Sequence, residues 1–196
     1  MNRPRYSSID LGRHHPDFKA SSWVQNVLAR DDMEIIPEVS PDPDNTSIMN
    51  PLFDSTLSHE TGLRARLLFR RPTSEPDSVV KHETCQFMSV GEGIDGRSGR
   101  GHGGFTSLVL DHLTGTVAKV ENPAADGEPP ATVTITVDYK APVRTPCIIL
   151  LRSWPIEISG RKAWMKGVVE GEDGKPYATA KALFINLKAP YQPAKL

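Results

Sequence analysis

The fold of this protein is decided by one run of its sequence, FTSLVLDHLTGTVA (residues 105–118). The run contains no proline, and its apolar residues recur at spacings of three and four, at Phe105, Leu108, Val109, Leu113 and Val117. Such spacing is typical of an amphipathic α-helix that buries one face. We therefore predict one long helix inside the chain, directly after a glycine-dense loop at residues 91–104.

Strand-like segments lie on both sides of this helix. Two precede it and four follow it. The first of the four (residues 132–139) alternates polar with apolar side chains, as strands do. The last three segments are joined by turns too short for crossover helices, so they must be antiparallel. This order predicts an α+β fold, in which an antiparallel sheet of five or six strands wraps around one long central helix. The other strand segments are residues 63–69, 79–90, 148–158, 162–170 and 177–187.

The first 60 residues have a different character. Residues 1–16 are polar, residues 17–30 carry apolar side chains at roughly helical spacing, and residues 37–60 contain four prolines among Asp, Asn and Ser. We predict an N-terminal arm with a short helix and a Pro-rich segment at residues 1–60, followed by one domain built on the helix and sheet at residues 61–196.

Composition argues against several classes of protein. The chain of 196 residues has 23 Lys+Arg and 24 Asp+Glu, a net charge of −1, so no global charge attracts it to nucleic acid or acidic membranes. No apolar run approaches the roughly 20 residues of a membrane helix, and the N-terminus lacks an apolar signal-peptide core. Cys85 and Cys147 form no pair motif, and the six histidines show no metal-ligand spacing. We expect a cytoplasmic protein with no metal or other cofactor, no nucleic-acid partner and no membrane contact.

The glycine loop matches the dinucleotide pattern G-x-G-x-x-G twice, at residues 91–96 and 99–104. A dinucleotide site needs a unit of parallel strands, whereas antiparallel hairpins follow this helix. Two other interpretations stay open. The loop is either a flexible connection with tight turns, or an electrophile site in which the unpaired N–H groups of Gly103 and Gly104 at the helix start stabilise an oxyanion.

Asp111 lies mid-helix among apolar residues, where a carboxylate is costly unless it is paired or exposed. With Gly104 and Ser107 it forms a polar stripe, which is either a solvated face or the wall of a site whose carboxylate activates water or attacks directly. Gly104 and Asp111 are roughly 10 Å apart along the helix axis, so one carbonyl group cannot easily touch both in one chain. Two antiparallel copies of the helix could bring them together; if both residues are catalytic, the protein should be at least a dimer.

Several motifs in the sequence are similar to those of a known family. His102-Gly103-Gly104, with Asp111 nine residues after the histidine, resembles the signature of hotdog-fold acyl-CoA thioesterases of the PaaI type. The resemblance extends over about residues 79–188 and includes YKAPV at residues 139–143, GRK at 160–162, and the last turn and strand at 173–185.

The resemblance implies a hotdog fold, in which the sheet wraps the central helix and dimers join their sheets edge to edge. It implies that Asp111 acts on the thioester as general base or nucleophile, and that the Gly104 N–H binds the thioester oxygen from the other subunit. His102 would orient the loop and Thr132 would assist catalysis. The residues we expect to bind the substrate are Gly103 and Ser107 on the helix and the basic residues Lys140, Arg161 and Lys162, of which the first two match positions that contact CoA and the third is a weaker candidate.

The function expected from these residues is hydrolysis of an acyl thioester by a homodimer or homotetramer. The expected substrate is acyl-CoA or an acyl carrier protein. Asp138 puts an acid near the path expected for the CoA phosphates, and this leaves room for the carrier protein as the alternative. Two alternatives stay open. One is a dehydratase, isomerase or cyclase on the same scaffold, because a carboxylate beside an oxyanion hole can also abstract a proton next to a carbonyl. The other is a non-catalytic module that binds acyl groups.

Overall fold

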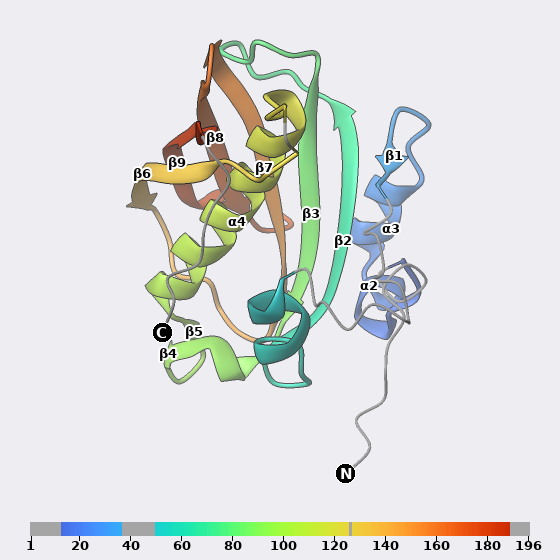
Figure 1. Ribbon diagram of the computed structural model, residues 1–196. Coiled ribbons are helices and arrows are strands. Elements are labelled where there is room, and N and C mark those ends of the chain that lie inside the picture. The colour runs from blue at the N-terminus through green and yellow to red at the C-terminus, as the bar shows by residue number, and fades with distance from the viewer. Residues whose placement is uncertain (1–12, 37–49, 126, 189–196) are drawn as a thin grey trace, which may run out of the picture.

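The computed structural model describes residues 13–36, 50–125 and 127–188 (Figure 1). An antiparallel sheet of seven strands forms its body, in the spatial order β1-β2-β3-β7-β8-β9-β6. A small hairpin of β4 (Asp95–Arg97) and β5 (Arg100–Gly101) stands apart from this sheet. The strands of the large sheet are β1 (Glu34–Ile35), β2 (Leu63–Pro72), β3 (His82–Val90), β6 (Ala131–Tyr139), β7 (Cys147–Ser159), β8 (Lys162–Glu170) and β9 (Pro176–Ile185).

The long helix α4 (Gly103–Glu121) lies across one face of the sheet, which curves around it (Figure 1). Val109, Leu110 and Leu113 are almost fully buried on this helix and belong to the main core that α4 forms with the sheet. The spacing of the apolar residues therefore predicts correctly which element forms the centre of the fold. The shorter helical segments are α2 (Pro16–Ala20), α3 (Ser22–Leu28), the π-helix η1 (Leu52–Thr56) and the 3-10 turn η2 (Glu92–Ile94).

The sheet is also covered on its other face, by α2 and α3. The side chains of β3 show that both faces are covered, because successive side chains of a strand point to opposite faces of the sheet. Cys85 and Phe87 lie in a second core with Phe18 of α2, whereas Met88 and Val90 lie in the core of α4. The sheet therefore has apolar packing on both faces at β3, with α4 on one side and the N-terminal helices on the other.

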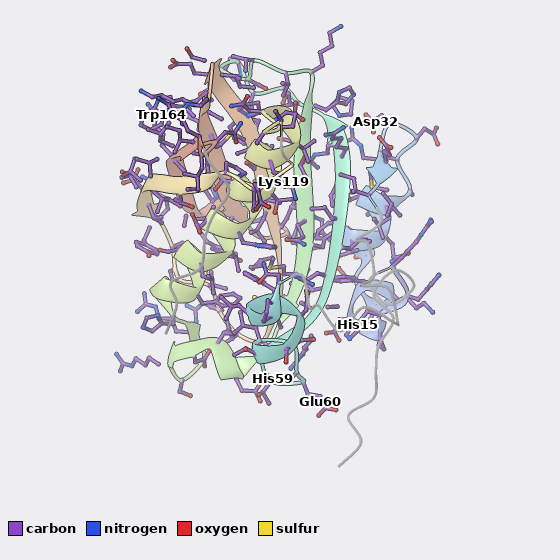
Figure 2. All side chains as sticks on the ribbon, viewed as in Figure 1. His15, Asp32, His59, Glu60, Lys119 and Trp164 are labelled. Atoms are coloured by element: carbon purple, nitrogen blue, oxygen red, sulfur yellow. The ribbon has the colours of Figure 1, made fainter. Side chains whose placement is uncertain are left out.

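The predicted α+β arrangement of an antiparallel sheet around one long helix, with an N-terminal helical extension, is confirmed. The sheet has seven strands, because the two residues of β1 pair with the outer edge of β2. The helix predicted at residues 17–30 is divided into α2 and α3. The division occurs because Ser21 is extended and its Oγ accepts a hydrogen bond from the Val24 N–H at 3.3 Å, as the N-cap of α3. His15, labelled in Figure 2, caps α2 through a bond of 3.3 Å from the Asp17 N–H to its Nδ1.

The Pro-rich segment is described only in part. Residues 37–49 lie outside the described residues, and η1 forms where the segment approaches β2. The division of the chain at residue 60 stays a prediction. In the three ranges that the structure describes, no helix is both long enough and apolar enough to cross a membrane.

Candidate active site

The β4–β5 hairpin leads directly into α4, and His102 is the N-cap of that helix. The His102 N–H donates to the Ile94 carbonyl (2.8 Å), and the His102 carbonyl accepts from the Phe105 N–H (3.0 Å). The His102 ring accepts a third bond at Nδ1, from the Gly104 N–H (2.8 Å). The amide that the sequence predicts to be an unpaired donor is therefore paired, because the N-cap side chain satisfies it.

Tyr139, the last residue of β6, closes over the first turn of α4. Its hydroxyl donates to the Gly103 carbonyl (2.9 Å) and lies 2.5 Å from Ser107 Oγ. Gly103 and Ser107, both predicted to bind substrate, thus lie together at the helix start. Sequence reasoning treats Tyr139 only as part of a motif, although an aromatic hydroxyl that ends an alternating strand is a signal that could have marked it.

Asp111 and Thr132 meet further along the same helix. The Thr132 hydroxyl donates to Asp111 Oδ1 over 3.0 Å. The Asp111 side chain is half-buried and Thr132 is exposed, so the pair lies at the surface of the domain, within reach of solvent or a ligand. A carboxylate held by a hydroxyl at such a place can activate water or attack a carbonyl group.

A β-bulge makes this contact possible. Ile135 and Val137 pack against the core of α4, so strict alternation would turn Val133 toward the helix and Thr132 away from it. The register with β9 instead shifts between Thr132 and Thr134, and Val133 is the extra residue. The predicted alternation of this strand is therefore wrong at Val133, whose side chain is 55% exposed.

The predicted catalytic residues, with the predicted substrate-binding residues Gly103 and Ser107, thus form two groups within one chain. His102, Gly103, Gly104 and Ser107 gather at the start of α4, while Asp111 pairs with Thr132. Seven residues of helix separate Gly104 from Asp111, which is roughly 10 Å along the axis. One thioester carbonyl therefore cannot easily contact both the Gly104 amide and the Asp111 carboxylate in a single protomer.

The predicted basic residues are also divided between two places. Lys140 follows β6 and lines a pocket of about 310 Å³ beside the start of α4. Arg161 and Lys162 lie at the turn into β8, next to the end of β9 that pairs with the beginning of β6. Arg161 Nη1 donates to the Asn186 carbonyl (2.7 Å), so in this chain it holds the segment after β9. One protomer does not bring Lys140 together with Arg161 and Lys162.

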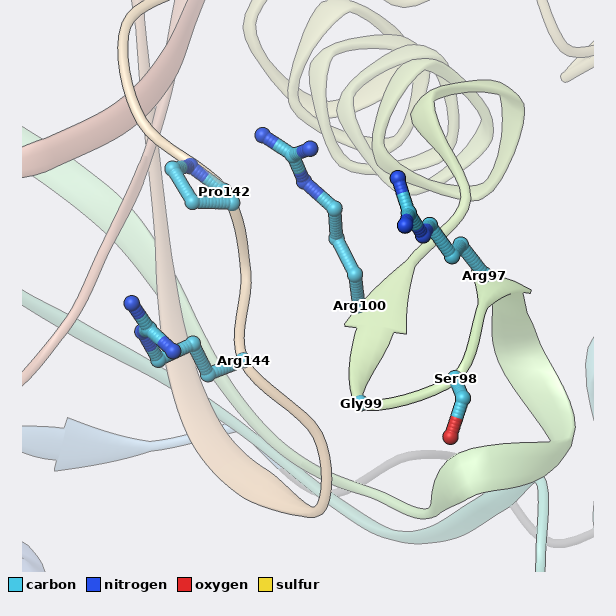
Figure 3. A pocket seen from close by; sticks show the side chains of 6 residues that line it. All are labelled: Arg97, Ser98, Gly99, Arg100, Pro142 and Arg144. Carbon is cyan, nitrogen blue, oxygen red and sulfur yellow. The ribbon is translucent and has the colours of Figure 1, made fainter.

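Sequence reasoning missed two arginines near Lys140, Arg97 and Arg100. The third arginine beside them, Arg144, is one of the basic residues near strand ends, which from the sequence are either solvated or able to hold phosphates. Arg97, Arg100 and Arg144 line a second pocket of about 310 Å³ (Figure 3). Arg100 also lines the pocket of Lys140. The signal in the sequence was the presence of two arginines inside the glycine loop, where tight turns alone do not call for them.

His112 is a packing residue, although it follows Asp111 on the helix. Its ring stacks on Phe53 with centroids 3.9 Å apart, and its Nδ1 lies 3.3 Å from Asn50 Nδ2. Burial lowers the pKa of His112 to about 4, and the Arg66 cation contributes to the decrease. The ring is therefore neutral near pH 7. Within the described ranges, no three His, Cys, Asp or Glu side chains are placed to hold a metal ion.

An antiparallel sheet that curves around one long helix, entered through a His-Gly-Gly motif, is the hotdog class of fold. Comparison with known proteins adds a family match over part of the chain. Residues 99–178 match the model of the thioesterase superfamily. The matched segment contains the helix start, Asp111 and Thr132. The resemblance to the thioesterase superfamily that the sequence predicts is confirmed over these residues.

Two relatives show the extent of the similarity. Acyl-coenzyme A thioesterase THEM4 of Mus musculus is 30% identical over 109 residues, which are 55% of this chain and 45% of that protein. The Xenopus laevis protein of the same name is 28% identical over 154 residues, 70% of this chain and 66% of that protein. The chain thus spans about half the length of the mouse relative. The crystal structure of zebra fish thioesterase superfamily member 2 aligns with 60% of this chain and 81% of its own, at 18% identity and a TM-score of 0.48.

Proposed function

We propose that this protein is a thioesterase, which hydrolyses an acyl thioester to a carboxylic acid and a thiol. The observation that supports this most is the hydrogen bond of 3.0 Å from the Thr132 hydroxyl to Asp111 Oδ1. Thr132 faces the helix only because β6 has a bulge at Val133. The match of residues 99–178 to the thioesterase superfamily supports the same chemistry, as do the names of the two relatives.

Asp111 is the general base or the nucleophile of this reaction. Thr132 holds one carboxylate oxygen, Oδ1, and so orients the other, Oδ2. As a base, Asp111 takes a proton from water while the water oxygen attacks the thioester carbon; the C–S bond then breaks and the sulfur leaves as a thiol after gaining a proton. As a nucleophile, Asp111 displaces the thiol to form an anhydride, which water cleaves. Both routes end in acid and thiol.

The Gly104 amide stabilises the oxyanion, a contribution of about 3–4 kcal/mol for one such donor. The same N–H donates to His102 Nδ1, so the thioester oxygen either shares this N–H with the histidine nitrogen or replaces that nitrogen as its acceptor. A Cβ at Gly104 would lie 2.8 Å from His102 Nδ1. Glycine therefore leaves room for the histidine cap and for the substrate oxygen on the same amide.

The complete site forms between two protomers. β6 is the last strand of the sheet and pairs with β9 on one side only, so its other edge offers backbone groups to a second copy. Antiparallel pairing of two β6 edges makes the two α4 helices antiparallel, which can place Asp111 of one protomer beside Gly104 of the partner subunit. We propose a homodimer with two equivalent sites. A homotetramer built from two such dimers keeps the same sites.

The substrate that we propose is an acyl-CoA, the class named in both relatives, with a protein-borne acyl thioester as the alternative. Lys140 of the protomer that supplies Gly104 would lie on the substrate's path, and Arg161 and Lys162 of the other protomer would lie on the side of Asp111. We also propose a cytoplasmic location, which the free Cys85 and Cys147 support because a reducing compartment keeps thiols unpaired.

The experiment is turnover of acyl-CoA thioesters, aliphatic and aromatic, with a reagent that detects free thiol. Asp111→Asn should lower kcat by about 10²- to 10⁴-fold while the fold and the oligomer persist. Asp31→Asn, which removes an exposed carboxylate outside the site, is the matched control. Full activity of Asp111→Asn would refute the assignment. Substrate conversion without thiol release would identify one of the alternative reactions instead.

A further inference from the structure

Three arginines surround the pocket beside the β4–β5 hairpin. Arg97 and Arg100 are cross-strand partners in the hairpin, and Figure 3 shows both side chains on the same side of it. Arg144 enters from the segment between β6 and β7, on the opposite wall with Pro142 (Figure 3). All three side chains are exposed. The pocket, of about 310 Å³, is therefore bounded by cations that come from two parts of the chain.

The charged residues that line this pocket are all cations. In the part of the chain that the structure describes, none of the three arginines forms an ion pair with a carboxylate. The carboxylate of the hairpin itself, on Asp95, accepts hydrogen bonds from groups other than these arginines. It accepts a bond of 2.7 Å from the Gly99 N–H and another from the Thr145 hydroxyl.

Two arginines of the large sheet, by contrast, are paired with carboxylates. Arg66 pairs with Asp54 at 2.6 Å, and Arg152 pairs with three glutamates at 2.8 to 3.1 Å. Like charges directly opposite each other on two strands destabilise a hairpin. The arrangement of Arg97 against Arg100, with Arg144 facing them, thus opposes folding, and a bound anion would relieve the repulsion.

The arginine pocket adjoins the proposed active site. Arg100 and Pro142 line this pocket and also the one that contains Gly103, Tyr139 and Lys140. Lys140 is partly neutralised, since its Nζ lies 3.9 Å from the Asp138 carboxylate. A substrate with its thioester at the start of α4 could therefore place a charged tail among the arginines of the same protomer.

We propose that Arg97, Arg100 and Arg144 bind the phosphate groups of the substrate, which makes a nucleotide-bearing thiol such as CoA the leaving group. This inference rests on the proposed function, since it assigns one end of the same substrate. Guanidinium groups suit the task, because each can donate two parallel hydrogen bonds to one phosphate and keeps its charge at any physiological pH. The cluster selects acyl-CoA over thioesters that lack the nucleotide.

The kinetic test compares two substrates with the same acyl group, an acyl-CoA and the corresponding acylpantetheine, which has no nucleotide. In Arg97→Gln, Arg100→Gln and Arg144→Gln, KM for acyl-CoA should rise about tenfold, as expected for loss of a charged hydrogen bond. The ratio of kcat/KM between acyl-CoA and acylpantetheine should fall by a similar factor. Lys19→Gln, which removes an exposed cation on α2, is the control and should leave the ratio unchanged.

A second test needs no turnover. Adenosine 3′,5′-bisphosphate should bind the wild-type protein in a calorimetric titration, should bind less tightly as salt increases, and should bind the triple arginine variant at least tenfold more weakly. Equal binding by both proteins, or none by either, overturns the arginine site. So does a rise in KM confined to an acyl carrier protein substrate. Bisphosphate binding that depends on the arginines, in a protein that releases no thiol, would refute the hydrolase and support the phosphate site.

Discussion

The contact between Thr132 and Asp111 gives the most specific prediction for a single side chain. Thr132→Val replaces the hydroxyl by a methyl group of similar size and removes the only donation that the structure describes to Asp111 Oδ1, at 3.0 Å. A hydrogen bond to a charged acceptor contributes about 1.5–3 kcal/mol, and the exposure of Thr132 puts this one near the lower value. We therefore expect kcat to fall about tenfold, since each 1.4 kcal/mol corresponds to about a factor of ten.

The assay is thiol release under saturating acyl-CoA, with urea denaturation to follow the fold. The free energy of unfolding should fall by no more than about 1.5 kcal/mol, because the hydrogen bond that is lost lies at the surface and Val is well tolerated on a strand. Thr132→Ser should keep most of the activity. Thr134→Val makes the same change on the opposite face of β6 and should have no effect. Wild-type kcat in Thr132→Val, or an equal loss in Thr134→Val, would refute the reasoning.

Two further predictions concern residues beside the site. The pKa of His112 is about 4 in the fold and about 6.5 in the unfolded chain, so its stabilising effect is complete above pH 6.5 and is lost as the pH falls toward 4. The free energy of unfolding should therefore decrease by about 1–3 kcal/mol more in the wild type than in His112→Gln over that range; parallel curves from urea denaturation would contradict this. Tyr139→Phe removes the bond to the Gly103 carbonyl and should lower the free energy of unfolding by about 1 kcal/mol. An unchanged urea midpoint would show that this contact does not hold β6 to α4.

The central helix could be predicted because its signal is local. The apolar residues from Phe105 to Val117 repeat with the helical period. The ends of the helix were less visible. α4 begins at Gly103 and ends at Glu121, because His102 and Asn122 cap it. Capping depends on hydrogen bonds at the helix ends, which leave no sign in the spacing of apolar residues.

The contact between Asp111 and Thr132 could not be read from the alternation of β6. Val133, Ile135 and Val137 are equally apolar, so the pattern contains no sign of an extra residue. The bulge arises from the register with β9, about fifty residues later in the sequence. Only the resemblance to the thioesterase family singled out Thr132, and the bulge supplies the physical reason that it can reach the helix.

The basic residues show a second limit of sequence reasoning. Lys140 and Arg161 both lie near strand ends, and the sequence does not tell which end of the sheet each one occupies. The order of strands separates them in one chain, and it brings Lys140 instead to the side of Arg100.

The pairing of the Gly104 amide was also difficult to predict, since a histidine two residues earlier is a weaker cap signal than Ser, Thr, Asp or Asn.

The claim that Asp111 and Gly104 act from different protomers can be tested with mixed dimers. Asp111→Asn and Gly104→Val should each be inactive alone. After the two proteins are mixed in equal amounts, unfolded and refolded together, half of the dimers contain one protomer of each kind. Each of these has one intact site, so about a quarter of the wild-type thiol release should return. No recovery, with mixed dimers shown to be present by mass spectrometry, would contradict a site shared between two chains.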